Sequence, residues 1–332
     1  MTVLVTGASG FLGAGLVRRL LSAGVRVRVL VRSAVKAKPL TAQGAEAVVS
    51  DINDSSALAA GLDDVAVVYH LAGRLLVPGV PATEYHRTHV EGTKLLLACC
   101  QRAPRLERFV HCSTTGVLGV TGDRPADETA PFRPTNIYEA TKAEAEQAVR
   151  ETWRADFPAV IARPGLVYGP GDLHLLGFFR SVLRRRFRPI GRHAIWLHPI
   201  YIDDMTEALV RCGQHPGAVG ECFHIAGREP VSLAGLADAI ARAGGTNVPP
   251  GHIPLPAARV VAALGDRLPP DLKRSAPLTR SRLDFLTHSR VYDVTKAKRL
   301  LGFEAGTDLS TGAAQSMAWY RQHGHLTAGA TS

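Results

Sequence analysis

Long apolar runs and amphipathic segments alternate through the first half of this chain of 332 residues. Continuous apolar runs predict buried strands at 2–6, 26–31, 46–49, 65–71, 107–112 and 159–163. Between them, apolar positions at helical spacing predict helices at 11–23, 54–60, 83–102 and 136–155. Strands that are apolar throughout and alternate with helices are typical of a parallel sheet covered on both faces. The pattern therefore predicts an α/β fold built on a doubly wound parallel sheet.

The pattern changes after Pro164, where turn residues become frequent. Residues 165–172 (GLVYGPGD) are expected to form a loop, followed by a basic helix and by the segment PIYIDD at 199–204. Later segments predict a strand at 222–226, a helix at 232–243, a proline-rich stretch around 249–270, and helical structure from 293 to 320. The residues from His325 onward are expected to fray.

The turn after the first strand is rich in glycine, since residues 3–13 read VLVTGASGFLG. Gly7 and Gly10 lack the Cβ atoms that would keep the backbone away from a phosphate, and Gly13 lets the next helix pack close to the sheet. The free N–H groups at the start of that helix favour an anion. Three glycines alone are a weak signal, but a strand before them and a helix after them are the expected context. We therefore predict that this turn binds a dinucleotide cofactor and that Ser9, Phe11 and Leu12 also contact the cofactor.

This motif is typical of a Rossmann-type sheet. The change of pattern after Pro164 divides the chain in two. Residues 1–164 are predicted to form the dinucleotide-binding domain. Residues 165–332 are predicted to form mainly a smaller α/β lobe that binds a small-molecule substrate. Segments around 198–226 are predicted to return from this lobe to the Rossmann core.

The formal net charge of +10 raises nucleic acid as a partner. The densest basic run is 180–192 (RSVLRRRFRPIGR), which contains one aromatic residue and belongs to no recognisable nucleic-acid-binding module. We interpret this run as the solvated face of a helix that also reaches cofactor phosphates. No nucleic-acid partner is therefore expected.

Signals for export, membrane insertion and disulfide formation are absent from the sequence. No stretch approaches the roughly 18 apolar residues of a membrane span, and no signal-peptide pattern precedes the first strand. The cysteines are odd in number and lack CxxC spacing: Cys99, Cys100, Cys112, Cys212 and Cys222. This usage favours reduced, buried thiols over a disulfide frame or a zinc site. We therefore expect a cytoplasmic protein.

Two segments carry side chains suited to proton transfer or to polar contacts. In YEATK, Tyr138 and Lys142 lie four residues apart and so share one face of a predicted helix. A nearby ammonium favours the phenolate, so we expect Lys142 to lower the pKa of Tyr138 toward neutral pH and make it a general acid or base. Upstream, HCSTTG ends a predicted strand in hydroxyl residues, which alone would also fit a polar turn. The three motifs in this order are more specific than any one of them.

Together these segments resemble the extended short-chain dehydrogenase/reductase family, the NAD(P)-dependent epimerase/dehydratase group. The resemblance is closest to the 3β-hydroxysteroid dehydrogenase and dihydroflavonol reductase-like branch, and it covers nearly the whole chain. The matching segments are TGASGFLG (6–13), SDIND (50–54), HLAG (70–73), VEGT (90–93), CST (112–114), YEATK (138–142), RPGLVYGP (163–170) and IYIDD (200–204).

The resemblance implies a role for each of these segments. Thr114 would polarise the substrate oxygen, Tyr138 would donate or accept the proton, and Lys142 would hold the nicotinamide ribose. Asp51 and Ile52 would border the adenine. The other residues implied at the cofactor are Leu71, Ala72, Gly73, Pro164, Gly165 and Val167, while 163–170 would shape the substrate side. A homodimer through helix pairs is implied as well.

Three positions depart from the family's pattern. Thr115-Gly116 stands where sugar-nucleotide dehydratases have an Asp-Glu pair, so dehydration is not expected. Leu197 stands where many nucleotide-sugar enzymes have an arginine for the diphosphate, which disfavours such a substrate without excluding it. His89 stands where the family has asparagine. His86 and His89 are three residues apart, but no third ligand has suitable spacing, so we expect a hydrogen-bonded helix histidine and no metal site.

The end of the second predicted strand bears on the choice between NAD and NADP. An acidic residue there would bind the ribose 2′-hydroxyl and repel a 2′-phosphate. The chain instead reads VLVRS at 29–33, with Arg32 at the tip and Lys36 and Lys38 after it. A cation in place of the carboxylate favours NADP(H), with NAD as the alternative.

The sequence thus predicts an NAD(P)-dependent oxidoreductase that interconverts a secondary alcohol and a ketone on a hydrophobic small molecule, with Tyr138 as general acid/base. The predicted substrate contacts are Arg74, Thr114, Thr115, Tyr168, Leu173 and Leu197. One alternative is a nucleotide-sugar epimerase with tightly bound NAD, which would use the same Tyr138 and Lys142. Another is a non-catalytic nucleotide sensor or scaffold. The intact Thr114, Tyr138 and Lys142 argue against the sensor, because a sensor needs no proton donor.

Overall fold

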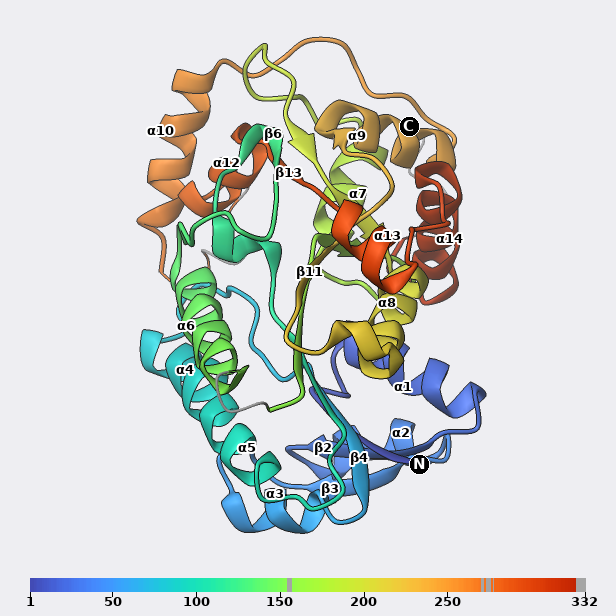
Figure 1. Cartoon of the computed structure of the whole chain (residues 1–332). Coiled ribbons are helices and arrows are strands. Elements are labelled where there is room, and N and C mark those ends of the chain that lie inside the picture. Colours follow the sequence, from blue (N-terminus) through green and yellow to red (C-terminus); the bar gives the residue numbers. More distant parts are fainter. Residues whose placement is uncertain (154–156, 270–271, 273–275, 277, 327–332) are drawn as a thin grey trace.

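The computed structural model describes residues 1–153, 157–269, 272, 276 and 278–326 (Figure 1). Its centre is a seven-stranded sheet in the order β3-β2-β1-β4-β5-β7-β11, and every neighbouring pair is parallel. The strands are β1 (Thr2–Thr6), β2 (Arg26–Val31), β3 (Glu46–Val49), β4 (Val65–His70), β5 (Arg108–Cys112), β7 (Ala159–Pro164) and β11 (Cys222–Ile225). The six strands predicted in the first half are all present, so the predicted parallel sheet is confirmed.

Two groups of helices cover the two faces of this sheet. On one face lie α1 (Phe11–Ser22), α2 (Ala34–Thr41), α8 (Ile202–Gln214) and α13 (Thr295–Leu301). On the other face lie α3 (Ser55–Gly61), α5 (Gly92–Cys100) and α6 (Ile137–Thr152). Because both faces are covered, the central strand β4 is buried at every position. This double burial is the physical origin of the continuous apolar runs in the sequence.

Strand β11 comes from far along the chain but completes the edge of the sheet. It pairs in parallel with β7, where Cys222 lies opposite Ile161 and Ile225 lies opposite Pro164. Helix α8, which precedes it, packs against α1 and against β4, β5 and β7. A large part of 198–226 therefore lies against the sheet or within it.

The remaining elements of the second half gather beyond the sheet, in the upper part of Figure 1. One apolar cluster joins β8 (Leu166–Tyr168), α7 (Leu176–Leu183), β9 (Trp196–Leu197), β10 (Pro199–Tyr201), β12 (Val231–Ser232), α9 (Leu233–Gly244) and α14 (Leu309–Gln322). A smaller cluster joins α10 (Leu255–Asp266) to α12 (Arg280–Thr287). Between these parts, β6 (Gly122–Ala126) pairs with β13 (Arg290–Tyr292).

Several predicted helices differ from those observed. The helix predicted at 83–102 consists of α4 (Ala82–His86), a π-helical turn at Arg87–Glu91, and α5. Helix α2 was not predicted, because its only buried residues are Ala37 and Leu40 and it contains Pro39. The end of the helix predicted at 136–155 lies partly outside the described residues.

The prediction that the arginine run 180–192 forms a helical face is wrong. Helix α7 ends at Leu183, so only Arg180 of these arginines is helical. The proline-rich stretch at 249–270 contains a regular helix, α10. Over the described residues, none of the helices combines the length and the hydrophobicity that crossing a bilayer requires.

Candidate active site

The glycine turn closes tightly between β1 and α1. Gly7 has a φ of +69°, and a Cβ on it would lie 2.5 Å from the carbonyl carbon of Leu71. A Cβ on Gly13 would lie 2.2 Å from the carbonyl oxygen of Gly7. No side chain fits at either position without moving backbone. Gly10 caps α1 without a side-chain hydrogen bond, which leaves the first N–H groups of the helix available to an anion. This cradle fits a dinucleotide's pyrophosphate.

Two further segments meet the glycine turn. After β4, the N–H groups of Leu71 and Ala72 donate to the carbonyl and hydroxyl oxygens of Thr6, each at 3.2 Å. On the other side, a Cβ on Gly171 would lie 3.4 Å from the Phe11 ring. The loop after β1 and the loop after β4, which both carry predicted cofactor residues, are thus brought together. Of the other residues predicted to contact the cofactor, Ser9 is exposed and Leu12 is partly buried.

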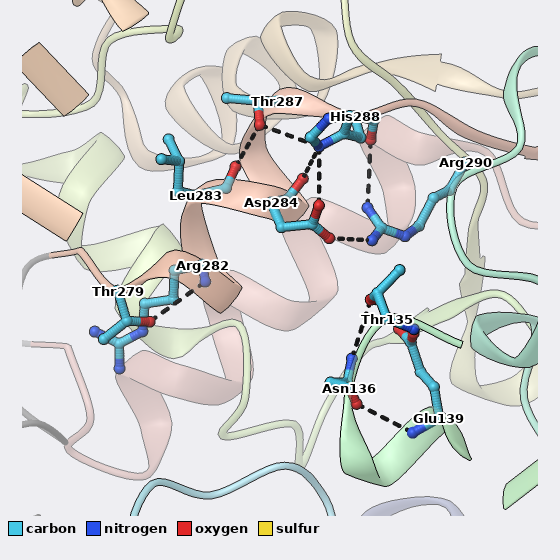
Figure 2. A network of polar contacts seen from close by, with 10 residues as sticks. All are labelled: Thr135, Asn136, Glu139, Thr279, Arg282, Leu283, Asp284, Thr287, His288 and Arg290. Carbon is cyan, nitrogen blue, oxygen red and sulfur yellow. Dashed lines mark hydrogen bonds and ion pairs between the residues drawn. The ribbon is translucent and has the colours of Figure 1, made fainter. Parts of the chain in front are cut away.

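Helix α6 begins where a network of side-chain caps holds its first turn (Figure 2). The Asn136 side chain accepts a hydrogen bond from the Glu139 N–H at 3.0 Å. The Glu139 carboxylate in turn accepts from the N–H and hydroxyl of Thr135 at 2.7 and 2.8 Å. Reciprocal capping of this kind satisfies the open N–H groups of a helix start. It fixes the position of Tyr138 in that first turn.

Lys142, one turn after Tyr138, fastens α6 to the end of β5. Its ammonium donates a hydrogen bond of 2.6 Å to the carbonyl oxygen of Cys112, and its side chain is almost fully buried. Burial lowers the pKa of Lys142 from its ordinary value. The lysine therefore reaches the strand end that carries Thr114.

The expectation that Lys142 lowers the pKa of Tyr138 is wrong for this structure. The phenolic end of Tyr138 is surrounded by protein, and this burial raises its pKa to about 12, although a hydrogen bond with Thr114 acts in the opposite direction. The physical reason is that desolvation of the phenolate outweighs the interactions that favour it. At neutral pH the phenol is therefore protonated and can donate a proton.

The two threonines after β5 have different surroundings. Thr114 caps a short helical turn, where its hydroxyl oxygen accepts from the Gly116 N–H at 3.1 Å, and it also hydrogen-bonds Tyr138. Thr115 is buried, and its hydroxyl donates to the carbonyl oxygen of Pro164 at 3.0 Å. Thr114 thus lies beside the phenol. Thr115 was predicted to contact the substrate, but its hydroxyl is buried and hydrogen-bonded within the protein.

A buried ion pair beneath α6 was missed by the sequence analysis. Arg163, which the resemblance placed on the substrate side, is fully buried and donates to the Glu146 carboxylate at 2.7 Å. Ser113 donates to the same carboxylate at 2.7 Å and Arg150 at 2.9 Å. Glu146 follows Lys142 by four residues, so the pair supports the helix face that carries the lysine. That spacing was the one signal available in the sequence.

His89 also has a more specific position than the sequence indicated. Its Nε2 accepts from the Arg74 N–H at 2.9 Å, so its Nδ1 carries the proton and donates to the Thr141 hydroxyl at 2.8 Å. Its ring meets the Tyr138 ring edge-on, with 5.7 Å between centroids. The expected helix histidine is present, but its hydrogen bonds are not the local ones expected, since they reach residues 15 and 52 positions away in the chain. It connects the loop after β4 with the helix of Tyr138.

Four histidines in this part of the molecule are buried and neutral. Burial lowers the pKa of His70, His89 and His224 to about 3 and that of His111 well below its ordinary value. The charge of Lys142 adds to this effect for His70, His89 and His111. The imidazole of His111 has no hydrogen-bond partner at either nitrogen among the described residues.

Charged side chains lie near one another where β2 and β3 end. Arg32 is exposed directly after β2, and the Ser33 side chain caps α2 by accepting from the Lys36 N–H at 3.4 Å. Asp51 lies 3.7 Å from Arg87. Partial burial raises the pKa of Asp51. Hydrogen bonds from Asn53 and the charges of Arg87 and Arg32 lower it by more, so the pKa is below its ordinary value.

Ile52 is buried in the apolar cluster on the α3–α5 face of the sheet. A Cβ on Gly92 would lie 2.7 Å from its Cγ2, so the side chain is tightly enclosed. On the opposite side of the site, Pro164 is buried, and Gly165 and Val167 are partly buried. A Cβ on Gly165 would lie 2.4 Å from the carbonyl oxygen of His198.

The structure does not gather the predicted substrate residues of the second half around one space. Tyr168 is buried in the lobe's apolar cluster, with its ring edge-on to that of Tyr201 at 5.7 Å. Leu197 is buried in the same cluster, whereas Leu173 is 57% exposed. Arg74 lies closer to the site, but its guanidinium is 3.7 Å from the Glu84 carboxylate.

The cysteines and histidines form no metal site in the part of the chain that the structure describes. His86 and His89 face different surroundings, since His86 is partly exposed and contacts Glu91 and Glu144, whereas His89 is buried. All five cysteines are free thiols; four are buried and Cys99 is partly exposed.

A parallel sheet with a glycine turn after its first strand, and with a Tyr–Lys helix fastened to the end of a central strand, defines a Rossmann-type, nucleotide-dependent enzyme. A model of the NAD dependent epimerase/dehydratase family matches residues 3–226 of this chain. The chain belongs to that family, and it is an NAD(P)-dependent enzyme of the extended short-chain dehydrogenase/reductase type.

Two curated relatives extend over almost the whole chain. The 4-hydroxy-2-methyl-3-oxo-4-farnesyl-3,4-dihydroquinoline-1-oxide ketoreductase of Stigmatella aurantiaca is 32% identical, covering 91% of this chain and 92% of its own. The 3 beta-hydroxysteroid dehydrogenase/Delta 5-->4-isomerase of Mycobacterium tuberculosis is 31% identical, covering 91% of this chain and 85% of its own.

Two solved structures share the architecture. The structure of gox2253 superimposes with a TM-score of 0.80 at 28% identity, covering 98% of this chain and 99% of that one. The UDP-glucuronic acid 4-epimerase of Bacillus cereus, in complex with UDP-glucuronic acid and NAD, has a TM-score of 0.77 at 23% identity, covering 97% and 100%. This second likeness concerns the fold alone.

Proposed function

We propose that the protein is a ketoreductase that interconverts a ketone and a secondary alcohol on a hydrophobic small molecule, with Tyr138 as the proton donor. The observation that carries this proposal is the position of Thr114 beside a protonated Tyr138, with Lys142 one helical turn away. A neutral phenol suits reduction, because the alkoxide oxygen formed from a ketone needs a proton.

A bound nicotinamide would supply or accept the hydride; its pyrophosphate would lie at the turn formed by Gly7, Gly10 and Gly13. The Thr114 hydroxyl would hold the substrate oxygen against the Tyr138 phenol. Lys142 would hold the nicotinamide ribose and keep α6 fastened to β5. The family resemblance implies these roles. They are supported by the position of the glycine turn and Thr114 at the carboxyl ends of strands, where ligands of such sheets bind.

Two observations support a hydrophobic ketone as the substrate. The two curated relatives are a ketoreductase of a farnesylated quinoline oxide and a hydroxysteroid dehydrogenase, and both substrates are large and apolar. Thr115-Gly116 offers no acid and base for eliminating water, and Leu197 offers no cation for a diphosphate. Burying two phosphate charges without paired cations would cost several kcal/mol.

The second candidate is a nucleotide-sugar epimerase with tightly bound NAD. It is favoured by the shared fold with the UDP-glucuronic acid 4-epimerase, and by the fact that epimerisation needs the same tyrosine and lysine. Purified protein that carries bound NAD and shows no net redox turnover would identify this activity.

A thermal-shift and kinetic screen separates the two candidates. With NADPH present, apolar ketones are expected to raise the melting temperature and to be reduced, because a ligand that binds only the native state stabilises it. UDP- and dTDP-sugars are expected to cause neither a shift nor competition. Micromolar binding of any nucleotide sugar would overturn the ketoreductase proposal in favour of the epimerase.

We further propose NADP(H) as the preferred cofactor. Arg32 is exposed at the end of β2, the position from which a side chain meets the ribose 2′ group in Rossmann folds, and Lys36 follows in the first turn of α2. Asp51, a carboxylate that interacts with Arg32, follows β3 and is already paired with Arg87. A cation at the tip favours a 2′-phosphate.

Arg32→Asp is expected to weaken NADPH binding by about 10–100-fold and NADH binding by only a few-fold. The change removes a charge-assisted contact and adds repulsion to the 2′-phosphate. Fluorescence titration with both cofactors measures the two affinities. Arg102→Asp, which makes the same charge change at another exposed site, is the control. Equal losses for both cofactors, or a wild-type preference for NADH, would contradict the proposal.

Three coarser expectations belong with this function. We propose that residues 1–164 form the cofactor-binding half and 165–332 mainly the substrate lobe. The resemblance supports a homodimer through helix pairs. The five free thiols support a reducing, cytoplasmic location.

A further inference from the structure

Helix α10 (Leu255–Asp266) buries its small residues and exposes its large aliphatic ones. On the inner side, Ala258, Ala262 and Gly265 are buried. A Cβ on Gly265 would lie 2.1 Å from the carbonyl oxygen of Leu278, so the inner side allows nothing larger there. The large outward side chains are Val260 (61% exposed), Val261 (43%), Leu264 (56%) and, just past the helix, Leu268 (39%).

These outward residues form one stripe, which we call the α10 stripe. Positions 260, 261, 264 and 268 are spaced by one, three and four residues, so they share a helical face. Single exposed aliphatic residues are ordinary, but three on one face of one helix, with a fourth directly after its end, mark a surface that contacts something apolar. Figure 1 places α10 at the edge of the molecule, with α12 on its inner side.

A strongly basic segment adjoins the start of this helix. Residues 180–192 contain six arginines, and no Asp or Glu occurs from 173 to 202. Backbone hydrogen bonds tie this segment to the residue before Pro254: Ile253 donates to Pro189 at 2.8 Å, and Gly191 donates to Ile253 at 2.9 Å. Most of the arginines are exposed: Arg180, Arg184, Arg185, Arg186 and Arg192.

We propose that the α10 stripe and the basic segment 180–192 together dock the protein on the surface of a bilayer that contains anionic lipids. Helix α10 would lie in the plane of the interface with its stripe among the upper acyl chains, and the arginines would contact the headgroup phosphates. An apolar helical face next to clustered arginines is the composition of interfacial membrane-binding elements. Contact of this kind requires no segment that spans the bilayer.

Charge favours a bilayer over a second copy of this chain. A twofold interface is self-complementary, so two α10 stripes that pair in parallel would bring the two adjoining arginine segments close to each other. With no carboxylate from 173 to 202, these segments would repel across such an interface. An anionic surface instead attracts both. The proposal does not depend on the proposed activity, and its test measures binding alone.

The test is co-flotation of the full chain with vesicles of phosphatidylcholine, with or without phosphatidylglycerol. The protein is expected to float with the anionic vesicles, and less so as salt rises, because screening weakens the arginine contacts. Val260→Ser, Val261→Ser and Leu264→Ser combined are expected to lower the vesicle partition coefficient by about tenfold or more. Arg184→Gln with Arg186→Gln is expected to lower it by about fivefold for each arginine.

Two control variants change the same residue types elsewhere. Val219→Ser removes an aliphatic side chain that is 42% exposed, and Arg102→Gln with Arg105→Gln removes two exposed arginines. Both should float like the wild type. All substitutions are at exposed positions, and unchanged thermal unfolding checks the fold of each variant.

Three outcomes would overturn the proposal. One is absence of flotation with anionic vesicles. Another is flotation that the triple serine variant leaves unchanged, which would mean that α10 takes no part. The third is a dimer, seen by sedimentation without lipid, that the triple variant dissociates, which would assign the stripe to a second copy of the chain.

Discussion

Replacing Tyr138 by Phe is expected to lower kcat by about 10²–10⁴-fold while cofactor affinity stays within a few-fold of the wild type. The substitution removes one oxygen atom, and this oxygen, which hydrogen-bonds with Thr114, is the proposed proton donor. The glycine turn and the Lys142–Cys112 hydrogen bond do not involve it. Steady-state kinetics on an accepted ketone measure kcat, and fluorescence titration measures the affinity for the cofactor.

Tyr201→Phe is the matched control for this experiment. It removes the same atom from a buried tyrosine whose hydroxyl donates to Gln315 within the apolar cluster of the second half. Its kcat is expected to stay near that of the wild type. Near-normal turnover of Tyr138→Phe would exclude Tyr138 as the proton donor. A parallel loss of cofactor binding would assign Tyr138 a structural role instead.

Acidification is expected to unfold the protein, because four histidines that are buried and neutral in the native state gain protons on unfolding. His70, His89 and His224 have pKa values of about 3 in the folded state, and that of His111 is also far below the ordinary value of about 6.5. Between pH 6.5 and 3 the unfolded chain therefore binds protons that the native state does not. Stability is complete above pH 6.5 and falls as the pH drops through this window.

The size of this effect follows from proton counting. Each buried histidine lowers the free energy of unfolding by about 1.4 kcal/mol per pH unit below pH 6.5, and four lower it by about 5 kcal/mol per unit. Burial raises the pKa of Glu128 and Asp172, which acts in the opposite direction but involves two groups against four. A total stability of about 5–15 kcal/mol would therefore be lost between about pH 5.5 and pH 3.5.

Urea unfolding followed by circular dichroism from pH 8 to pH 5 measures this slope. His89→Asn is expected to reduce the slope by about one proton, whatever its effect on stability at pH 8. His193→Asn, at an exposed position, is expected to leave the slope unchanged. A wild-type stability that is independent of pH across this window would show that the buried histidines are not kept neutral.

The features that could be predicted from the sequence are those that local pattern determines. Strands β1 and β4 are buried on both faces, so residues 3–5 and 65–69 are apolar without interruption. The constraint on Gly13 is equally local, because it comes from backbone within the turn, whereas the backbone that crowds Gly7 belongs to Leu71 and Ala72 after β4. The spacing of Tyr138 and Lys142 indicated a shared helix face in the same way.

The features that could not be predicted depend on residues that are distant in the chain. His89 bonds residues 15 and 52 positions away, and no periodicity encodes such a pair. The raised pKa of Tyr138 reflects burial, which tertiary packing determines and helical spacing does not. For the same reason, loop composition did not reveal that Tyr168 and Leu197 face the interior of the second lobe.

The late position of β11 in the chain has a consequence for how the nascent polypeptide matures. Among the described strands of the sheet, β11 alone covers the outer edge of β7, so that edge stays open until residue 225 has been synthesised and has left the ribosome. An uncovered edge offers unpaired N–H and C=O groups to other chains, and every residue of β7 is normally buried. The sheet therefore cannot be completed before residue 225 is available. A chain truncated after residue 164 would leave this edge of β7 open to other chains, which favours aggregation.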